Sequence, residues 1–244
     1  MGTYVIGDIH GCYDALIKML KKIHYCDNDE VICIGDYIDR GKQNYKMLKW
    51  METCPNNILL LQGNHEAEYT ANIDIMSKIA NNLQINIYSN HETQLLYRII
   101  NNIPEIHNAY FDNYQTIYNL IYNHSIDLQK LIYWSDIMKS MSYHYQKTVN
   151  GQLYIMVHAG YKKSDVEYCI YAREESFSKN STIIAGHTPT IIKKEFSYNS
   201  GNIYKKYNKE LNSTYINIDC GYVYNTEESK LACIRLEDLK EYYI

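Results

Sequence analysis

Six short polar motifs are spread along the chain, and each directly follows or overlaps a short apolar run. The runs are continuous and rich in Val, Ile and Tyr, which is typical of strands buried on both faces. Polar residues at the carboxyl ends of such strands gather at one edge of an open α/β sheet, where ligands bind. The motifs span Gly7–Gly11, Gly35–Gly41, Gly63–Glu66, Val157–Gly160, Gly186–Thr188 and Asn217–Gly221.

The order of these runs predicts an α/β fold with two sheets. In the first half, strands are predicted at 3–6, 30–34 and 58–61, and helices at 13–25 and 44–51. This β-α-β-α-β order requires crossover connections and predicts largely parallel strands. A second sheet is predicted from strands at 153–157, 182–185, 214–219 and 230–235. We therefore predict a two-sheet β-sandwich flanked by helices.

The segment from about residue 67 to 150 is rich in Asn, Tyr and Ile and carries no metal-type spacing. Helical stretches are predicted around 73–83, 91–101 and 128–141. We interpret the segment as a mostly helical insertion packed beside the site, where elements that shape the substrate pocket usually lie. Because the motifs run from end to end and no Pro-rich or Ser/Gly-rich linker interrupts them, we predict one catalytic domain over residues 1–244.

Bulk properties restrict the partners and the compartment. A net charge of −4 and a pI near 6.1 give no basic field, so a nucleic-acid partner is not expected. The sequence before the first strand has no basic region and no long apolar segment, so we expect no secretory signal and no membrane partner. Seven cysteines without CxxC spacing fit a reduced, cytoplasmic protein. No oligomeric state is predicted.

The motifs supply carboxylate, amide and imidazole groups, a mixed donor set that suits two divalent ions. Asp8 and His10, two apart on an extended segment, can converge on one ion. Asp36 follows the neighbouring strand through a turn at Gly35, so its carboxylate is the best candidate to bridge both ions. A lone histidine of this kind would more often be structural, but six motifs in order favour the metal interpretation. The second ion is completed by Asn64, His158 and His187.

The motifs resemble those of PPP-type metal-dependent serine/threonine phosphatases in the calcineurin-like metallophosphoesterase superfamily, particularly the compact bacterial and phage members. The resemblance covers residues 3–236 in motif order. It implies a dinuclear phosphomonoester hydrolase with two divalent ions, Mn²⁺ first and Fe, Zn²⁺ or Co²⁺ as alternatives. It also implies in-line attack by a hydroxide that bridges the two ions. The implied metal ligands are Asp8, His10, Asp36, Asn64, His158 and His187.

The resemblance also implies the remaining catalytic roles. His65 resembles the general acid that protonates the leaving oxygen, and Asp39 resembles the carboxylate that orients and charges it. Arg40 and Arg173 resemble the two arginines that clamp the phosphoryl oxygens, a task that suits the planar guanidinium. The expected substrate is a phosphorylated protein or a small phosphoester.

Several alternatives share these motifs. Symmetrical diadenosine tetraphosphate hydrolase is the nearest, because its sequence begins and ends similarly to Gly7–Asp14 and Leu231–Arg235. We lead with the phosphatase because Thr188-Pro189 after the histidine is more typical of that branch. Pro189 also stands where nucleases and cyclic-nucleotide phosphodiesterases of the superfamily carry the second His of GHxH. An inactive regulatory protein is disfavoured, because no ligand, acid or clamp arginine is missing.

Two departures from the family pattern concern the shape of the substrate site. Asn90–Thr93 stands where many relatives have Gly-Gly before Thr, and Tyr171 stands where many have Trp. Asp219 is interpreted as structural or as a support for the metal ligands. Cys12 and Cys220 lie beside motifs and are interpreted as packing residues. The histidines that match no motif are His24, His91, His107, His124 and His144.

Overall fold

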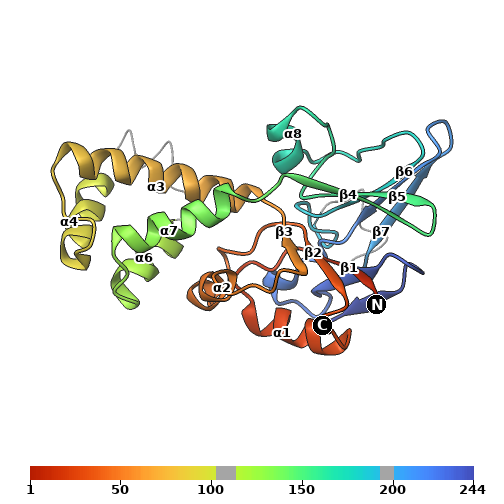
Figure 1. Cartoon of the computed structure of the whole chain (residues 1–244), viewed down its shortest axis with the longest axis horizontal. Coiled ribbons are helices and arrows are strands. Elements are labelled where there is room, and N and C mark those ends of the chain that lie inside the picture. The colour runs from red at the N-terminus through yellow and green to blue at the C-terminus, as the bar shows by residue number, and fades with distance from the viewer. Residues whose placement is uncertain (103–113, 193–200) are drawn as a thin grey trace.

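The computed structural model describes residues 1–102, 114–192 and 201–244, so His107 lies outside the described residues. Its strands form two five-stranded sheets flanked by helices (Figure 1), with the orders β10-β9-β1-β2-β3 and β4-β5-β6-β8-β7. This architecture confirms the predicted α/β sandwich. Within the described ranges, no helix is both long enough and apolar enough to cross a membrane.

The first sheet contains the predicted parallel core. β1 (Thr3–Ile6), β2 (Glu30–Cys33) and β3 (Ile58–Leu60) run parallel, joined by the crossover helices α1 (Tyr13–Lys22) and α2 (Asn44–Met51). The strand predicted at 230–235 was assigned to the second sheet, and this assignment is wrong. As β9 (Ala232–Arg235), it pairs antiparallel with β1, and β10 (Glu241–Tyr243) follows it. The pairing makes β1 a central strand and removes an open edge beside the first motif.

The second sheet has a parallel centre and antiparallel edges. β5 (Gln152–Val157), β6 (Ser181–Ala185) and β8 (Ser213–Asn217) run parallel, with α8 (Val166–Tyr171) after β5. The edges are β4 (His144–Val149), which ends the 67–150 segment, and β7 (Tyr204–Asn208). Neither edge strand was predicted, because both are polar and largely solvated and lack a continuous apolar run.

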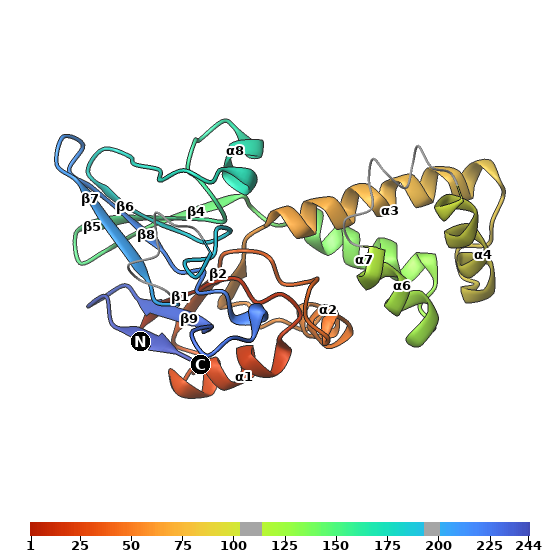
Figure 2. The same ribbon diagram turned by 180° about the vertical axis from the view of Figure 1, so that it is seen from behind.

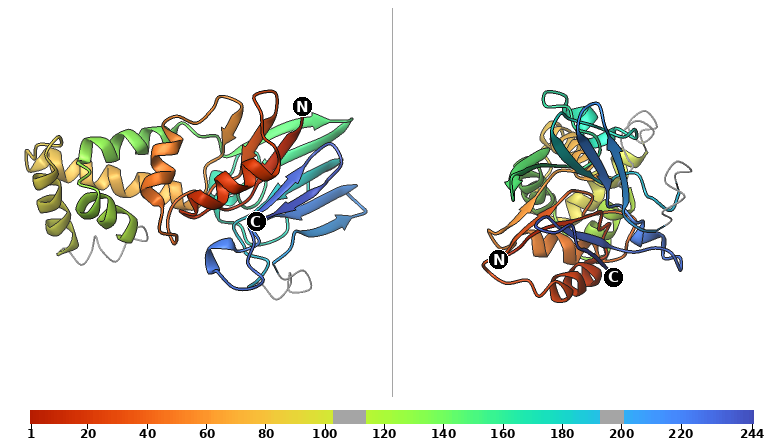
Figure 3. Two further views of the ribbon diagram at one scale, coloured as in Figure 1. Left: turned by 90° about the horizontal axis from the view of Figure 1, so that it is seen from below. Right: turned by 90° about the vertical axis from the view of Figure 1, so that its right-hand side faces the viewer.

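Four helices of the described part of the chain extend from the sandwich, as Figures 1 and 2 show. The view from below shows how far they project beyond the sheets (Figure 3). They are α3 (Asn64–Asn82), α4 (Asn90–Asn101), α6 (Tyr114–Asn123) and α7 (Leu128–Lys139). α6 was not predicted. α3 begins at the third motif, so its first residues belong to the site. Along its length it packs against α7 and α4.

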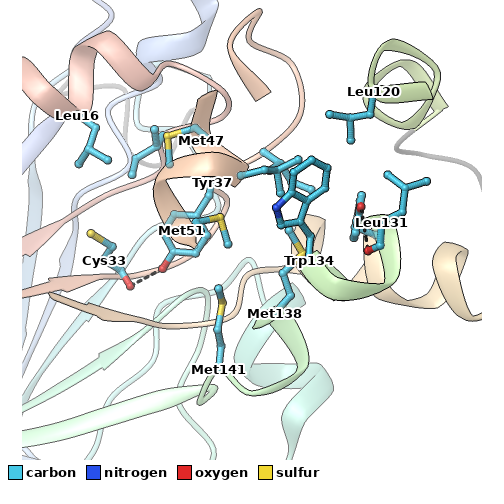
Figure 4. Packing of buried hydrophobic residues seen from close by; sticks show 14 of the residues in the cluster. Leu16, Cys33, Tyr37, Met47, Met51, Leu120, Leu131, Trp134, Met138 and Met141 are labelled. Carbon is cyan, nitrogen blue, oxygen red and sulfur yellow. Dashed lines mark hydrogen bonds between the residues drawn. The ribbon is translucent and has the colours of Figure 1, made fainter. Parts of the chain in front are cut away.

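Alternation along β1 explains why its sequence is apolar throughout. Val5 belongs to the core between the two sheets, whereas Ile6 belongs to the core between the first sheet and the helices. Trp134 of α7 and Met47 of α2 lie in this second core, together with Tyr37 (Figure 4). The Tyr37 hydroxyl donates to the carbonyl of Cys33 over 2.8 Å. The projecting helices therefore share one core with the helices that cover the first sheet.

Glu52, at the end of α2, joins this core to α7 through a partly buried ion pair. Its carboxylate accepts a 2.6 Å hydrogen bond from Trp134 Nε1 and lies 2.7 Å from Lys130 Nζ. Lys49 Nζ lies 2.7 Å from the second oxygen. Burial raises the pKa of Glu52, but these donors outweigh burial and lower the pKa from 4.5 to about 2. The ionised carboxylate is therefore the form that the folded protein stabilises.

This ion pair predicts a pH-dependent stability. The pKa of Glu52 is lower in the folded state than in the unfolded state. The stabilisation is therefore complete above pH 4.5, and it is lost as the pH falls from 4.5 toward 2. We expect Glu52→Gln to lower the free energy of unfolding by about 1.5–3 kcal/mol near neutral pH, and by less at about pH 3. Urea unfolding followed by tryptophan fluorescence measures both values. Glu227 is exposed, and Glu227→Gln should leave the free energy of unfolding unchanged at both pH values. An equal loss from Glu52→Gln at both pH values would contradict the ion-pair explanation.

Candidate active site

The predicted metal ligands lie just past the ends of four strands and at the start of one helix. Asp8 follows β1 and Asp36 follows β2, while Asn64 is the first residue of α3. The two remaining histidines follow the second sheet, at the ends of β5 and β6. All six side chains are buried: Asp8, His10, Asp36, Asn64, His158 and His187. The structure therefore brings together residues that are up to 179 positions apart in the chain.

Two groups of potential ligands meet at Asp36. One group contains Asp36, His10 and His65, and the other contains Asp36, His158 and His187. Oδ2 of Asp36 lies 3.4 Å from His10 Nε2, and Oδ1 lies 3.3 Å from His158 Nε2. One carboxylate thus faces both groups with different oxygens, which is the arrangement that a bridging ligand needs.

Backbone carbonyls orient two of these imidazoles. His10 Nδ1 donates to the Ile38 carbonyl over 3.1 Å, and His158 Nδ1 donates to the Ile34 carbonyl over 3.0 Å. Because the proton is held on Nδ1, the Nε2 atom of each ring is unprotonated and its lone pair points toward Asp36. The local sequence supports this, because both carbonyls belong to the chain leading into and out of the Asp36 turn.

Left-handed backbone conformations concentrate at the site. φ is +45° at His10, +53° at Asp36 and +64° at His187, and it is +70° at Asp39 and +61° at Arg40. Non-glycine residues adopt positive φ uncommonly and at an energetic cost. The surrounding structure must therefore hold these five residues in place.

Glu66 provides much of that support. It is fully buried, and its Oε2 accepts from the backbone N–H of Asp36 over 2.8 Å and of Gly63 over 3.0 Å. Its Oε1 accepts from the N–H of Tyr37 over 2.8 Å. Gly35 has φ +107°, and a Cβ there would lie 2.7 Å from the Gly63 nitrogen. Sequence reasoning gave Glu66 no role, although its place at the end of the third motif was a signal.

Glu68 sets the orientation of the Asn64 amide. Glu68 Oε1 accepts from Asn64 Nδ2 over 3.1 Å and from the Tyr171 hydroxyl over 3.2 Å. A carboxylate can only accept here, so Asn64 Oδ1 faces the other way, 3.1 Å from His158 Nε2 and 3.0 Å from His187 Nδ1. The oxygen is the atom that a hard divalent ion prefers. Glu68 matches no motif, so sequence reasoning missed it.

Burial keeps the candidate ligand histidines neutral. It lowers the pKa of His10 and of His187 to about 3, and it lowers the pKa of His158 as well. A metal binds the unprotonated imidazole, so these three side chains are ready ligands at neutral pH.

The carboxylates require a positive partner. Burial, and then the charges of Asp219 and Asp36, raise the pKa of Asp8 well above its ordinary value. Asp219, predicted as a supporting residue, is buried and accepts from the Gly221 N–H over 2.9 Å. Among the described residues, the buried atoms without a hydrogen-bond partner include Asp8 Oδ1, Asp219 Oδ2 and His187 Nε2. Buried oxygen and nitrogen atoms that carry a lone pair and lack a partner are suited to bind divalent cations.

His65 forms a dyad with Asp39. His65 Nδ1 lies 2.7 Å from Asp39 Oδ2, and His65 Nε2 lies 4.0 Å from Asp36 Oδ2. Burial lowers the pKa of His65, but the two carboxylates outweigh burial and raise the pKa to about 9. The imidazole is therefore protonated at neutral pH and can give a proton from Nε2.

The projecting helices reach this dyad through Thr116 of α6. The buried Thr116 hydroxyl donates to Asp39 Oδ1 in a short hydrogen bond, and Asn44 Nδ2 donates to Thr116 Oγ1 over 3.2 Å. Asn44 Oδ1 accepts from the Asp39 N–H over 2.9 Å. Two residues that sequence reasoning did not identify thus hold Asp39, and one of them comes from the unpredicted helix.

We expect Thr116→Val to reduce turnover through Asp39. The substitution keeps the shape but removes the hydroxyl, so Asp39 loses a donor and holds His65 less firmly. We expect kcat to fall by about tenfold, a loss of about 1.4 kcal/mol, with KM little changed. Thr116→Ser should retain most activity, because it keeps the donor. Equal losses from Val and Ser would show that packing, not the hydroxyl, is responsible.

The predicted clamp arginines line one cavity with the dyad. The cavity has a volume of about 500 Å³ and its lining includes Arg40, Arg173, His65 and Tyr171. Arg40 Nη1 lies 2.9 Å from His10 Nε2, and Nη2 lies 3.2 Å from His65 Nε2. A phosphoryl group in this cavity would meet both guanidinium groups beside the ligand cluster. Tyr171, which departs from the family pattern, lies on the same wall and contacts Glu68.

The described histidines that match no motif do not join the candidate metal ligands. His91 and His124 are exposed, and neither joins the groups of mutually close potential ligands in the described chain. Burial raises the pKa of the Cys12 thiol to about 11, which makes its thiolate scarce at neutral pH.

This fold and this cluster define a metal-dependent phosphoesterase. The calcineurin-like phosphoesterase family matches residues 1–200, and the chain belongs to that family. Membership implies hydrolysis of phosphoesters with divalent metal ions. The resemblance to the superfamily is thereby confirmed, whereas the narrower resemblance to PPP-type phosphatases stays a prediction.

The curated relatives are similar to this chain over part of its sequence, and the solved structures are similar to it in fold alone. The symmetrical bis(5′-nucleosyl)-tetraphosphatase of Buchnera aphidicola subsp. Baizongia pistaciae is 32% identical over 98 residues, which cover 39% of this chain and 35% of that protein. The match therefore spans about a third of the relative's length.

Solved structures share the fold at low identity. A crystal structure named as a candidate diadenosine tetraphosphatase has a TM-score of 0.58 and 13% identity, covering 100% of this chain and 93% of the other. A Saccharomyces cerevisiae serine/threonine phosphatase with similarity to human PP5 has a TM-score of 0.55 and 11% identity, covering 98% of this chain and 73% of the other.

Proposed function

We propose that this chain hydrolyses dinucleoside polyphosphates symmetrically, the nearest alternative named from the sequence. The observation that carries the proposal is the shared Asp36 carboxylate beside a cavity lined by two arginines and a histidine acid. The choice of substrate is supported by the names of the curated relatives, the symmetrical tetraphosphatases. Because these relatives are named for a dinucleotide and not for a phosphoprotein, this substrate replaces phosphomonoesters as the leading expectation.

The residues of the site would have three separate roles: holding metal ions, binding phosphate and donating a proton. Asp8, His10, Asp36, Asn64, His158 and His187 would hold two divalent ions. When bound, these ions supply Lewis-acid charge and lower the pKa of water, so that a nucleophile forms near neutral pH. Arg40 and Arg173 bind the phosphoryl oxygens and neutralise their charge. His65 holds a proton at Nε2 for the leaving oxygen, while Asp39 fixes the ring through Nδ1.

A comparison of substrates tests the proposal. Protein with added Mn²⁺ is offered diadenosine tetraphosphate, a phosphoserine/phosphothreonine peptide and a phosphotyrosine peptide, because ratios of kcat/KM define specificity. We expect the dinucleotide to be preferred and ADP to be its sole nucleotide product, as symmetrical cleavage requires. Chelator should abolish turnover. A phosphopeptide preferred by tenfold or more, or AMP and ATP as products, would refute the proposed substrate.

One observation favours the serine/threonine phosphatase as a second candidate. Thr188-Pro189 follows the ligand histidine, a pattern more typical of the phosphatase branch. The same comparison decides between the two, because both functions use the same metal cluster and differ in what lies beyond the phosphoryl group.

A further inference from the structure

A second cavity adjoins the catalytic cavity, and the chemistry described above leaves it without a role. Its volume is about 400 Å³, within the range of about 300–1,000 Å³ typical of small-molecule sites. Both cavities are lined by Arg40, Gln115 and Thr116. A ligand with its phosphoryl group at the catalytic arginine can therefore extend past Thr116 into the second space.

Two helices form the walls of this second cavity. One wall comes from Lys42, which directly follows the second motif, and from Tyr45 of α2. The other comes from Asn119 of α6 and from His124, which follows α6. The rings of Tyr45 and His124 stack across the two walls, with centroids 4.2 Å apart and an interplanar angle of 12°.

The charge of the cavity favours an anion. Lys42 and Arg40 both line it, and the described lining residues include no carboxylate. No described carboxylate lies within ion-pair distance of Lys42, which is exposed. Phosphate groups that continue from the catalytic cavity would meet Arg40 first and then Lys42.

The remaining lining suits a nucleobase better than a peptide. Side-chain amides such as those of Gln115 and Asn119 can pair with the donor and acceptor edge of a purine. The stacked Tyr45–His124 pair supplies an aromatic wall, and stacking on such walls is a general way to bind bases. Cations at the entrance and amides with stacked rings beyond them match the order of groups in a nucleotide.

We propose that this cavity binds one nucleotide of a dinucleoside polyphosphate, with its phosphates at Arg40 and Lys42 and its base at the Tyr45–His124 wall. The proposal deepens the proposed function and rests on it for the identity of the whole substrate. The proposal also assigns a function to the projecting helices. α6 forms one wall of the nucleotide site, and it also carries Thr116, which contacts Asp39.

Binding of ADP to the Mn²⁺-loaded protein tests the cavity separately from turnover. Isothermal titration calorimetry compares the wild type with Lys42→Ala and His124→Ala. We expect each variant to raise the Kd for ADP by about tenfold, while His124→Ala leaves the Kd for inorganic phosphate unchanged. His91→Ala removes an exposed imidazole from the same helical part and is the matched control. Wild-type ADP affinity in both variants, or no ADP binding by the wild type, would overturn the proposal.

Kinetics separate failure of the cavity from failure of the proposed function. In His124→Ala, the ratio of kcat/KM for diadenosine tetraphosphate to that for an aryl phosphate should fall by about tenfold. An unchanged ratio with a fully active enzyme would reject the nucleotide site but keep the proposed function. ADP binding that depends on Lys42 and His124 in an enzyme that does not cleave the dinucleotide would keep the site and reject the proposed function.

Discussion

Replacing Asp36 with Asn should abolish metal-dependent turnover. The two oxygens of Asp36 face different ligand groups, so one substitution affects both ions. Asn keeps the shape but replaces one oxygen with an amide nitrogen, which has no lone pair for a metal. Removing partners that merely orient metal ligands typically costs about 10–100-fold, so we expect a bridging ligand to cost at least about 100-fold in kcat.

Metal binding gives the Asp36→Asn prediction a readout besides activity. A metal that binds only the folded state raises its stability, by about 2.7 kcal/mol at a concentration of 100 times the Kd. We expect Mn²⁺ to raise the Tm of the wild type and to have little effect on Asp36→Asn. Each protein is compared with its own metal-free Tm, because Asp36→Asn also removes the charge that favours the protonated form of His65.

A matched substitution controls for the chemistry of the change. Asp136 on α7 is exposed, and Asp136→Asn should leave both turnover and the Mn²⁺-induced shift in Tm as in the wild type. If Asp36→Asn retains near-wild-type metal-dependent turnover, Asp36 does not bridge the ions.

The sequence could predict which side chains come together because each candidate ligand is part of a motif that follows a strand. Glycine, a carboxylate and histidine directly after a buried run are visible as letters, and parallel strands bring their ends to one edge. The residues that hold the ligands are not visible in this way. Glu68 and Thr116 act through side-chain contacts that depend on where α3 and α6 pack, and no local pattern encodes that packing.

The same reasoning explains the misassigned strand and the missed elements. β9 is an apolar strand that suits either sheet, and only its ladder with β1 assigns it to the first. β4 and β7 are edge strands whose solvated faces hide the apolar signal. The left-handed conformations at Asp39 and Arg40 were also unpredictable, because contacts such as that of Asn44 with the Asp39 N–H stabilise them.

Replacing His65 with Asn should slow the reaction most for substrates whose leaving oxygen is most basic. A general acid contributes about 10²–10⁴-fold when the leaving oxygen needs a proton. We expect kcat for phenyl phosphate to fall by about 10²-fold and kcat for p-nitrophenyl phosphate to fall far less, because the less basic nitrophenolate leaves unprotonated. A series of aryl phosphates measures this as a steeper dependence on leaving-group basicity.

The position of His65 allows a second interpretation that the same variant tests. His65 belongs to one of the two potential ligand groups with His10 and Asp36, so it could bind a metal rather than donate a proton. The hydrogen bond to Asp39 and a pKa raised to about 9 favour the acid, because a protonated imidazole has no lone pair to offer. An acid predicts a Mn²⁺ Kd within a few-fold of the wild type in His65→Asn, with the steeper leaving-group dependence. A ligand predicts weaker Mn²⁺ binding and an equal loss for every aryl phosphate.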